Sequence, residues 1–224
     1  MEFYFGRMSG NSLRVALGLL ESGAKFEPRP LDTKAGQNKQ PAYLSVNPMG
    51  KVPALTDGNT TLWESNAINW YLAEKNPQAK LLPASIEARA AVQRWMFFQA
   101  AHVTPAAVPI FRSTHPKLVA ALGPADPQAQ ETGRKELARF LPILDQQLEG
   151  RDWLETEFSL ADVANGPHLW LLNDAGFDFS ATPRLRAWID RLSARPAFEK
   201  GVALVYGDGW ATPKRPRMDD SNKG

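Results

Sequence analysis

The stretch from Asn47 to Leu55 constrains the fold more than any other part of the chain. Asn-Pro begins a turn there, and Gly50 can adopt the positive φ that closes it. The chain then enters an apolar strand through Pro53, which cannot donate to a sheet ladder and so belongs at a strand's first residue or edge. We predict a cis Val52–Pro53 bond, which turns the free backbone groups of Val52 outward to hold another extended backbone. The alternative is a loop ahead of an ordinary edge strand.

A hairpin and a helix follow this strand directly. Residues Asp57 to Thr60 have the composition of a hairpin turn, and Thr61 to Trp63 indicate a second short strand. A helix then begins at Glu64 or Ser65. The free N–H groups and the positive dipole at such a helix start suit a carboxylate.

Composition excludes several classes of site. The 224 residues contain no cysteine, so disulfides, cysteine metal sites and a protein thiol nucleophile are excluded, and any thiol must come from a ligand. The net charge of +2 is near balance and predicts no nucleic-acid partner. No run approaches the ~18 apolar residues of a membrane span, and Met1–Phe5 show no signal peptide, so we expect a cytoplasmic protein. The three histidines, His102, His115 and His168, are not spaced as metal ligands are.

The first part of the chain indicates a small α/β domain. Glu2–Phe5 form a short strand, and a helix whose apolar periodicity starts at Leu13 runs to Gly23. Phe26–Leu31 form a second strand whose two prolines favour an edge position. This order of strand, helix and strand predicts a right-handed crossover and a parallel pair.

The remainder of the chain indicates helices only, with no strand signal after Trp63. Pro105 and Pro109 predict a bend, or a break, in a long helix that starts near Ile86. Ser159 and Asp162 form a capping arrangement before another helix. We therefore predict a fold of α/β plus all-α class, with an α/β domain at 1–77, a linker at 78–85, an all-helical domain at 86–210 and a disordered tail at 211–224.

These segments resemble the glutathione S-transferase family. The sequence NPMGKVPAL, followed by LWESNAINWYL, is similar to the family's N-terminal domain. Further matches are the serine-bearing turn after the first strand, Lys39-Gln40-Pro41, Phe158–Asp162 and Arg195–Phe198, so the resemblance covers roughly residues 1–205. It is closest to serine-type, theta/phi-like bacterial members. It implies a thioredoxin-like domain followed by a helical bundle domain.

The resemblance implies a catalytic role for the turn after the first strand, where the family hydrogen-bonds the glutathione sulfur. A thiol has a pKa near ~8.5 and only the thiolate attacks, and a hydroxyl donor beside a helix N-terminus favours that anion. Ser9 is the first candidate, and Asn11 is the next because its amide can also donate. The structural alternative is that Ser12 or Asn11 caps a helix that starts near Leu13, with Ser9 too far out to cap it.

The resemblance also implies how the rest of glutathione is held. Val52, beside Pro53, would pair its backbone with the cysteinyl part. Glu64 would bind the ammonium of the γ-glutamyl end, and Ser65 with its backbone N–H would bind the carboxylate. Lys39 or Lys51 would reach the glycine carboxylate, and the alternative for each is an ordinary surface lysine.

The second substrate is expected between the two domains. Met8, Phe98 and His102 are its candidates from their positions on the first turn and the long helix. A histidine near Trp95 and Phe98 is also compatible with simple packing. Asp162, together with Asn47, is expected to serve the fold rather than catalysis.

The first hypothesis is a homodimeric enzyme of detoxification that adds the glutathione thiolate to a small hydrophobic electrophile. The second is a reductase of disulfides or peroxides that uses bound glutathione. The third is a transferase-like fold that binds a partner without catalysis.

Overall fold

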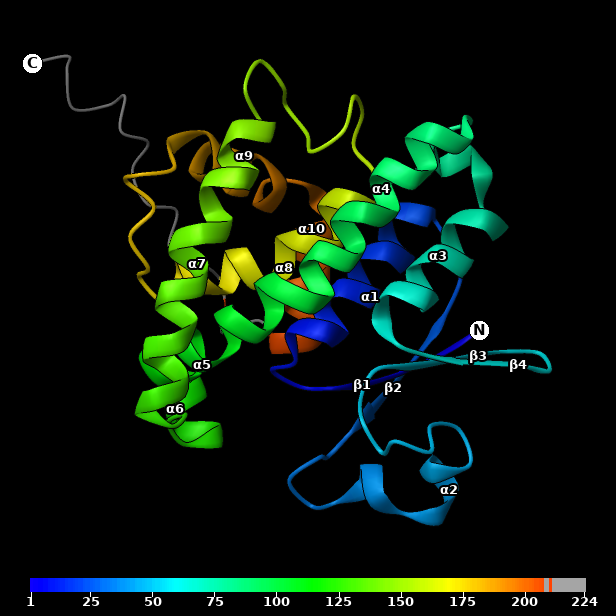
Figure 1. Cartoon of the computed structure of the whole chain (residues 1–224). Coiled ribbons are helices and arrows are strands. Elements are labelled where there is room, and N and C mark those ends of the chain that lie inside the picture. Colours follow the sequence, from blue (N-terminus) through cyan, green and yellow to red (C-terminus); the bar gives the residue numbers. More distant parts are fainter. Residues whose placement is uncertain (208–209, 211–224) are drawn as a thin grey trace, which may run out of the picture.

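The computed structural model describes residues 1–207 and Trp210, and the predicted disordered tail at 211–224 lies outside the described residues. A four-stranded sheet with its helices forms the first part of the chain, and a bundle of helices forms the rest (Figure 1). The predicted fold class is confirmed. The strands are β1 (Glu2–Gly6), β2 (Glu27–Leu31), β3 (Ala54–Asp57) and β4 (Thr60–Trp63).

The sheet has the order β2-β1-β3-β4. β1 pairs parallel with β2, where Phe3 lies opposite Pro28, and antiparallel with β3, where Phe3 lies opposite Leu55. The prolines of β2 are accommodated because this strand lies at the edge, as predicted. Since β3 and β4 are also antiparallel, the C-terminal ends of β1 and β4 and the N-terminal start of β3 lie side by side. We refer to this row of strand ends as one edge of the sheet.

Helices account for most of the described chain. Those of the first part are α1 (Gly10–Ser22), α2 (Pro41–Leu44) and α3 (Ser65–Lys75), with short 3-10 turns at η1 (Gln37–Lys39) and η2 (Pro77–Ala79). The bundle contains α4 (Ile86–Phe98), the π-helical η3 (Gln99–Val103), α5 (Thr104–Thr114), α6 (Pro116–Leu122), α7 (Pro127–Gln147), α8 (Leu160–Asp174), α9 (Pro183–Ser193) and α10 (Pro196–Tyr206). Within the described residues no strand follows Trp63, as predicted, whereas α6 was not predicted. No helix of the described chain is long and apolar enough to cross a membrane.

The predicted start of the first helix was wrong. α1 begins at Gly10, and Ser9 is its N-cap, with Oγ accepting a hydrogen bond from Ser12 N at 3.2 Å. Ser12 is instead buried and accepts from Gly6 N at 3.3 Å, so neither Ser12 nor Asn11 caps this helix. The reason is that the first turn of α1 is polar, so the apolar periodicity starts one turn later than the helix does.

Where the prolines predicted a bend or a break, the long helix changes type. The π-helical segment η3 separates α4 from α5, and Pro105 follows it at the start of α5. Pro109 lies inside α5. A proline lacks the N–H of the regular ladder, and single π-helical turns commonly occur where that ladder is disrupted.

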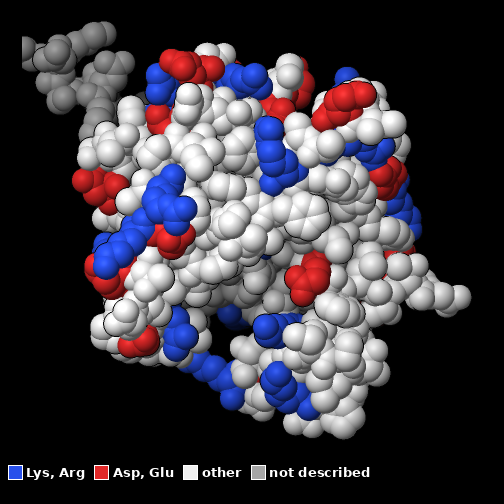
Figure 2. All heavy atoms as spheres, in the orientation of Figure 1, with Lys and Arg blue, Asp and Glu red and all other residues white. Residues whose placement is uncertain are grey.

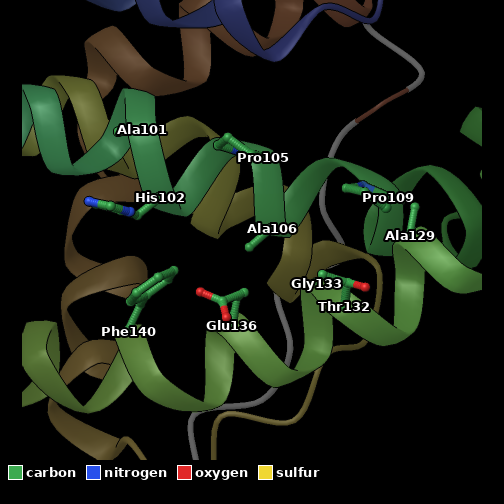
Figure 3. A pocket seen from close by; sticks show the side chains of 10 residues that line it. All are labelled: Ala101, His102, Pro105, Ala106, Pro109, Ala129, Thr132, Gly133, Glu136 and Phe140. Atoms are coloured by element: carbon green, nitrogen blue, oxygen red, sulfur yellow. The ribbon is translucent and has the colours of Figure 1, made fainter.

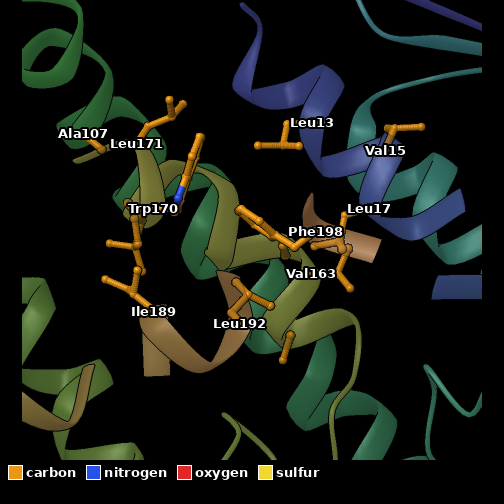
Figure 4. Close-up of a cluster of buried hydrophobic side chains, with 14 of the residues drawn as sticks. Leu13, Val15, Leu17, Ala107, Val163, Trp170, Leu171, Ile189, Leu192 and Phe198 are labelled. Carbon is orange, nitrogen blue, oxygen red and sulfur yellow. The ribbon is translucent and has the colours of Figure 1, made fainter. Parts of the chain in front are cut away.

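The core centres on α8, in which every residue from Leu160 to Leu172 is buried. Leu13 and Leu17 of α1 face this helix together with Phe198 of α10 (Figure 4). The rings of Trp170 and Phe198 lie 5.3 Å apart in an edge-to-face arrangement. The helix that follows the first strand therefore packs directly on the centre of the bundle.

The start of α8 is fixed by the predicted capping box of Ser159 and Asp162. The carboxylate of Asp162 accepts hydrogen bonds from Ser159 N at 3.0 Å, Leu154 N at 3.0 Å and Trp188 Nε1 at 2.8 Å. Burial raises the pKa of Asp162 to about 6, although these donors act in the opposite direction. Asp162 thus ties α8 to α9 and to the preceding loop, which supports the structural role expected for it.

Candidate functional site

The N-termini of α1 and α3 lie at the same edge of the sheet, because β1 leads into α1 and β4 leads into α3 there. Glu64, the N-cap of α3, has φ 69°. Positive φ is uncommon outside glycine, and such backbone outliers cluster at functional sites. Each helix start carries free N–H groups and a positive dipole end, so this edge can hold two anionic groups.

Ser9 can cap α1 and act on a ligand at the same time. Its Oγ accepts from Ser12 N, and no hydrogen bond within the described part of the chain uses its hydroxyl proton. That proton is free to be donated to an anion at the helix start. Asn11 is also placed there, and its Oδ1 accepts from Arg14 Nη1 at 2.6 Å, which leaves its amide N–H groups available. Ser9 and Asn11, the two residues predicted to bind the glutathione sulfur, therefore each have a hydrogen-bond donor at this end of the helix.

Val52 lies beside the same turn. The Val52–Pro53 bond is cis, as predicted, and Val52 takes part in no backbone hydrogen bond among the described residues. A Cβ atom placed on Gly6 would lie only 2.8 Å from Val52 Cγ2, so the end of β1 needs glycine to approach this side chain. The unpaired backbone of Val52 is thus next to the turn that carries Ser9.

Side chains hold the loop that precedes Val52. Tyr43 donates its hydroxyl to the Lys51 carbonyl at 2.6 Å, and Asn47 Nδ2 donates to the same oxygen at 2.7 Å. Asn38 Nδ2 donates to the Gly50 carbonyl at 2.7 Å. Burial raises the pKa of Tyr43 to about 12, so its hydroxyl remains a donor. This agrees with the structural role expected for Asn47.

The two candidate lysines belong to this loop and its neighbour. Lys39 Nζ lies over the loop, 3.4 Å from the Met49 carbonyl, and Lys51 is part of the loop itself. Both side chains belong to exposed residues. Lys and Arg atoms border a hollow between the part of the molecule that carries α2 and the part that carries α5 and α6 (Figure 2). Such a rim favours an anionic ligand.

Arg14 connects the site, although the sequence interpretation missed it. This arginine is only 2% exposed, and its Nη1 donates to Asn11 Oδ1 at 2.6 Å and to Ser65 Oγ at 2.8 Å. Burial lowers its pKa to about 9, against the opposing effect of the Glu64 carboxylate, so it is charged at neutral pH. The available signal was a charged residue within the apolar run from Leu13 to Leu20, three positions after Asn11.

A cavity of about 430 Å³ lies against these residues. One wall is formed by Asn11, Arg14, Glu64 and Ser65, which brings three of the predicted residues together. The rest of the lining comes from α3, α4, η3 and α5, namely Asn66, Ala67, Trp70, Gln93, Met96, Phe97, Gln99, Ala100 and Thr104. A charged and polar wall together with a mixed polar and apolar lining suits a small ligand with charged ends.

The structure does not bring the three candidates for the second substrate together. His102 lines a separate cavity of about 300 Å³ between η3, α5 and α7, and Glu136 and Phe140 of α7 line the side of that cavity opposite His102 (Figure 3). The ring of Phe98 lies 5.4 Å from that of His102 and 5.7 Å from that of Phe140. Met8 lies elsewhere, in the turn before α1, where its N–H donates to the Val205 carbonyl at 3.2 Å. Phe98 and His102 thus face α7.

Comparison with known proteins covers most of the chain. The family model described as "Glutathione S-transferase, N-terminal domain" matches residues 1–74, and that described as "Glutathione S-transferase, C-terminal domain" matches residues 99–196. Glutathione S-transferase 3 of Zea mays is 37% identical over 213 residues, which cover 92% of this chain and 94% of that protein. Glutathione S-transferase F9 of Arabidopsis thaliana is 33% identical over 89% of this chain and 95% of its own length.

Solved structures give the same result. A glutathione S-transferase-I bound with lactoylglutathione has a TM-score of 0.81 and 31% identity, covering 91% of this chain and 98% of that one. A glutathione transferase from Pseudomonas putida, with one glutathione disulfide bound per subunit, has a TM-score of 0.78 and 25% identity, covering 90% of each chain.

Proposed function

The chain belongs to the glutathione S-transferase family, and on that basis we propose that it conjugates the glutathione thiolate to a hydrophobic electrophile. One observation carries this proposal. The hydroxyl of Ser9, the unpaired backbone of Val52 and the start of α3 at Glu64 and Ser65 converge at one edge of the sheet. These groups match the sulfur, the central peptide and the γ-glutamyl end of one extended tripeptide.

The chemistry asked of the protein is modest. The Ser9 hydroxyl donates to the sulfur and the α1 dipole adds positive potential, so the pKa of the bound thiol falls and the thiolate is present at neutral pH. Asn11 is the second candidate for this donor. The thiol proton is lost to solvent, and the sulfur then forms a bond to the electrophilic carbon of a substrate held beside it. The bond from that carbon to its leaving group breaks, and the leaving group departs to solvent with the bonding electrons, as halide does from an aryl halide.

Binding is assigned to groups remote from the sulfur. Glu64 holds the ammonium and Ser65 the carboxylate of the γ-glutamyl end, while Val52, oriented by Pro53, pairs with the cysteinyl backbone. Lys39 and Lys51 share the role of meeting the glycine carboxylate. Glu64 and Ser65 are supported by their place in the lining of the cavity. Lys39 is supported by its position over the loop that contains Lys51 and leads to Val52, where its Nζ lies 3.4 Å from the Met49 carbonyl.

We propose that the electrophile binds near the turn before α1, where Met8 is its candidate contact, rather than in the second cavity. Phe98 and His102 remain candidates only for an electrophile that reaches the α7 side of the long helix.

We further propose a serine-type, theta/phi-like bacterial member that works in detoxification. The serine in the first turn supports the serine type. The neighbour from Pseudomonas putida is a bacterial protein with this fold, while the relatives of higher identity come from Zea mays and Arabidopsis thaliana. A homodimer is supported by Phe97, which is 72% exposed beside the cavity that Trp70 and Met96 also line. A cytoplasmic location is supported by the chemistry of the co-substrate, because the cytosol keeps thiols reduced.

The domain division is also proposed, with a glutathione-binding domain at 1–77, a linker at 78–85 and a helical domain at 86–210. The two family models, which match residues 1–74 and 99–196, support it.

Retention on immobilised glutathione, followed by a conjugation assay with an activated aryl halide, tests the proposed function. We expect the protein to be retained, to elute with free glutathione and to conjugate the halide. Reduction of a disulfide or a peroxide without conjugation would favour the reductase hypothesis. A protein that ignores the resin and shows neither activity is a binding module instead.

A further inference from the structure

His168 of α8 makes a short contact with Arg14 inside the protein. The side chain is 2% exposed, and its Nδ1 lies 2.6 Å from Arg14 Nη2. Because a guanidinium has only donors, Nδ1 is the acceptor and the ring is neutral, with its proton on Nε2. Burial first, and then the charge of Arg14, lowers the pKa of His168 far below its ordinary value. The ring therefore remains an acceptor at neutral pH.

Neighbouring residues fix the orientation of this ring. The Phe111 ring lies 5.7 Å from it, centroid to centroid, and Thr104 Oγ1 lies 3.4 Å from Nδ1. On the other side, a Cβ atom placed on Gly10 would lie 2.9 Å from Nε2, so the first residue of α1 must be glycine for the ring to lie there. His168 thus reaches the helix start that carries Ser9.

The other nitrogens of Arg14 are already engaged. Nε donates to the Ala164 carbonyl at 2.9 Å, and Nη1 uses its hydrogens on Asn11 Oδ1 and Ser65 Oγ. Nη2 donates to His168 Nδ1. If it were lost, a buried charged donor would lack that acceptor, and the guanidinium would have to turn toward another one. Any such turn moves Nη1 away from Asn11 or Ser65.

We propose that His168 is a positioning residue for the glutathione site, because its Nδ1 holds Arg14 in the orientation that serves Asn11 and Ser65 together. This inference rests on the proposed function. It extends the site to a helix of the bundle, and it assigns a role to a histidine that the sequence interpretation had set aside.

The test compares His168→Asn with His168→Leu. The Oδ1 of asparagine lies two bonds from Cβ, as the Nδ1 of histidine does, so asparagine keeps an acceptor near the same position. Leucine is similar in size to asparagine and has no acceptor. We expect His168→Leu to raise the KM and Kd for glutathione about tenfold and His168→Asn to stay within about twofold of wild type. The KM for the electrophile should be unchanged in both. A merely structural defect would instead lower the active fraction and leave both KM values in place.

His168→Gln is the second variant, since its acceptor reaches the position of Nε2 rather than that of Nδ1. It should weaken glutathione binding as His168→Leu does, and it keeps the test informative if the leucine variant does not fold. If the asparagine and glutamine variants bind glutathione equally well, whether normally or weakly, the inference is overturned. The proposed function still stands in that case, provided that the wild-type chain binds glutathione. A wild-type chain that fails to bind glutathione refutes the proposed function and the inference with it.

Discussion

Replacing Asp162 by alanine should destabilise the fold without touching the glutathione site. The carboxylate is fully buried and is the acceptor for Leu154 N, Ser159 N and Trp188 Nε1. Alanine leaves these three buried donors without this acceptor, at ~1–3 kcal/mol each, or ~3–9 kcal/mol together. Removal of a carboxylate whose pKa is raised from 3.8 to about 6 returns roughly 3 kcal/mol at neutral pH. The expected net loss is about 3 kcal/mol.

Thermal and urea unfolding measure this loss. For a chain of this size, about 3 kcal/mol lowers the Tm by ~6–12 °C. Asp152→Ala is the matched control, since Asp152 has a side chain that is 74% exposed and forms an ion pair with surface Arg191, and it should change stability by less than ~0.5 kcal/mol. Asp162→Ala with the stability of that control would refute the assignment of the capping box as a structural anchor.

The same pair of proteins gives a pH signature. The pKa of Asp162 is higher in the folded chain than in the unfolded one, so its contribution to stability is greatest at low pH and falls as the pH rises toward 6. The alanine variant lacks this contribution. The stability difference between wild type and variant should therefore widen by roughly 2 kcal/mol between about pH 7 and about pH 4.5. A difference that narrows on acidification would contradict the raised pKa.

Three further predictions concern the site and its supports. Ser9→Ala should cost about 1 kcal/mol through the lost cap and should reduce turnover at neutral pH, with recovery at higher pH; a pH profile that overlays wild type would transfer the role to Asn11. Glu64→Ala and Ser65→Ala should each weaken the binding of glutathione by about 1.5–3 kcal/mol, which raises the glutathione KM more than it lowers kcat. An unchanged KM in both variants refutes their assignment. Gly18→Ala should destabilise the chain by ~1–3 kcal/mol in urea, because its Cβ atom would lie 2.2 Å from the Oδ1 of a buried asparagine; an unshifted midpoint would show that this asparagine can move.

Local patterns were enough to predict most of the sheet and the binding loop. Prolines identified β2 as an edge strand, and the turn at Gly50 with Pro53 led to the cis bond. The polar first turn of α1 hid the true start of the helix, since periodicity detects only apolar residues. Arg14 and His168 are 154 positions apart and became interpretable only once the fold placed them in contact. The prolines at 105 and 109 indicated an irregularity in the long helix, but not that it would be the π-helical segment η3.

The packing of α1 against α8 has a consequence for synthesis on the ribosome. Arg14 is made early, but its partners Ala164 and His168 are added about 150 residues later. At ~5–20 residues per second, the nascent chain spends roughly 8–30 s with this arginine and the apolar face of α1 lacking their final neighbours. During that interval Leu13 and Leu17 lack the neighbours from α8 and α10 that cover them in the folded chain. The arrangement of Arg14 that serves Asn11 and Ser65 in the proposed site is therefore completed only near the end of translation.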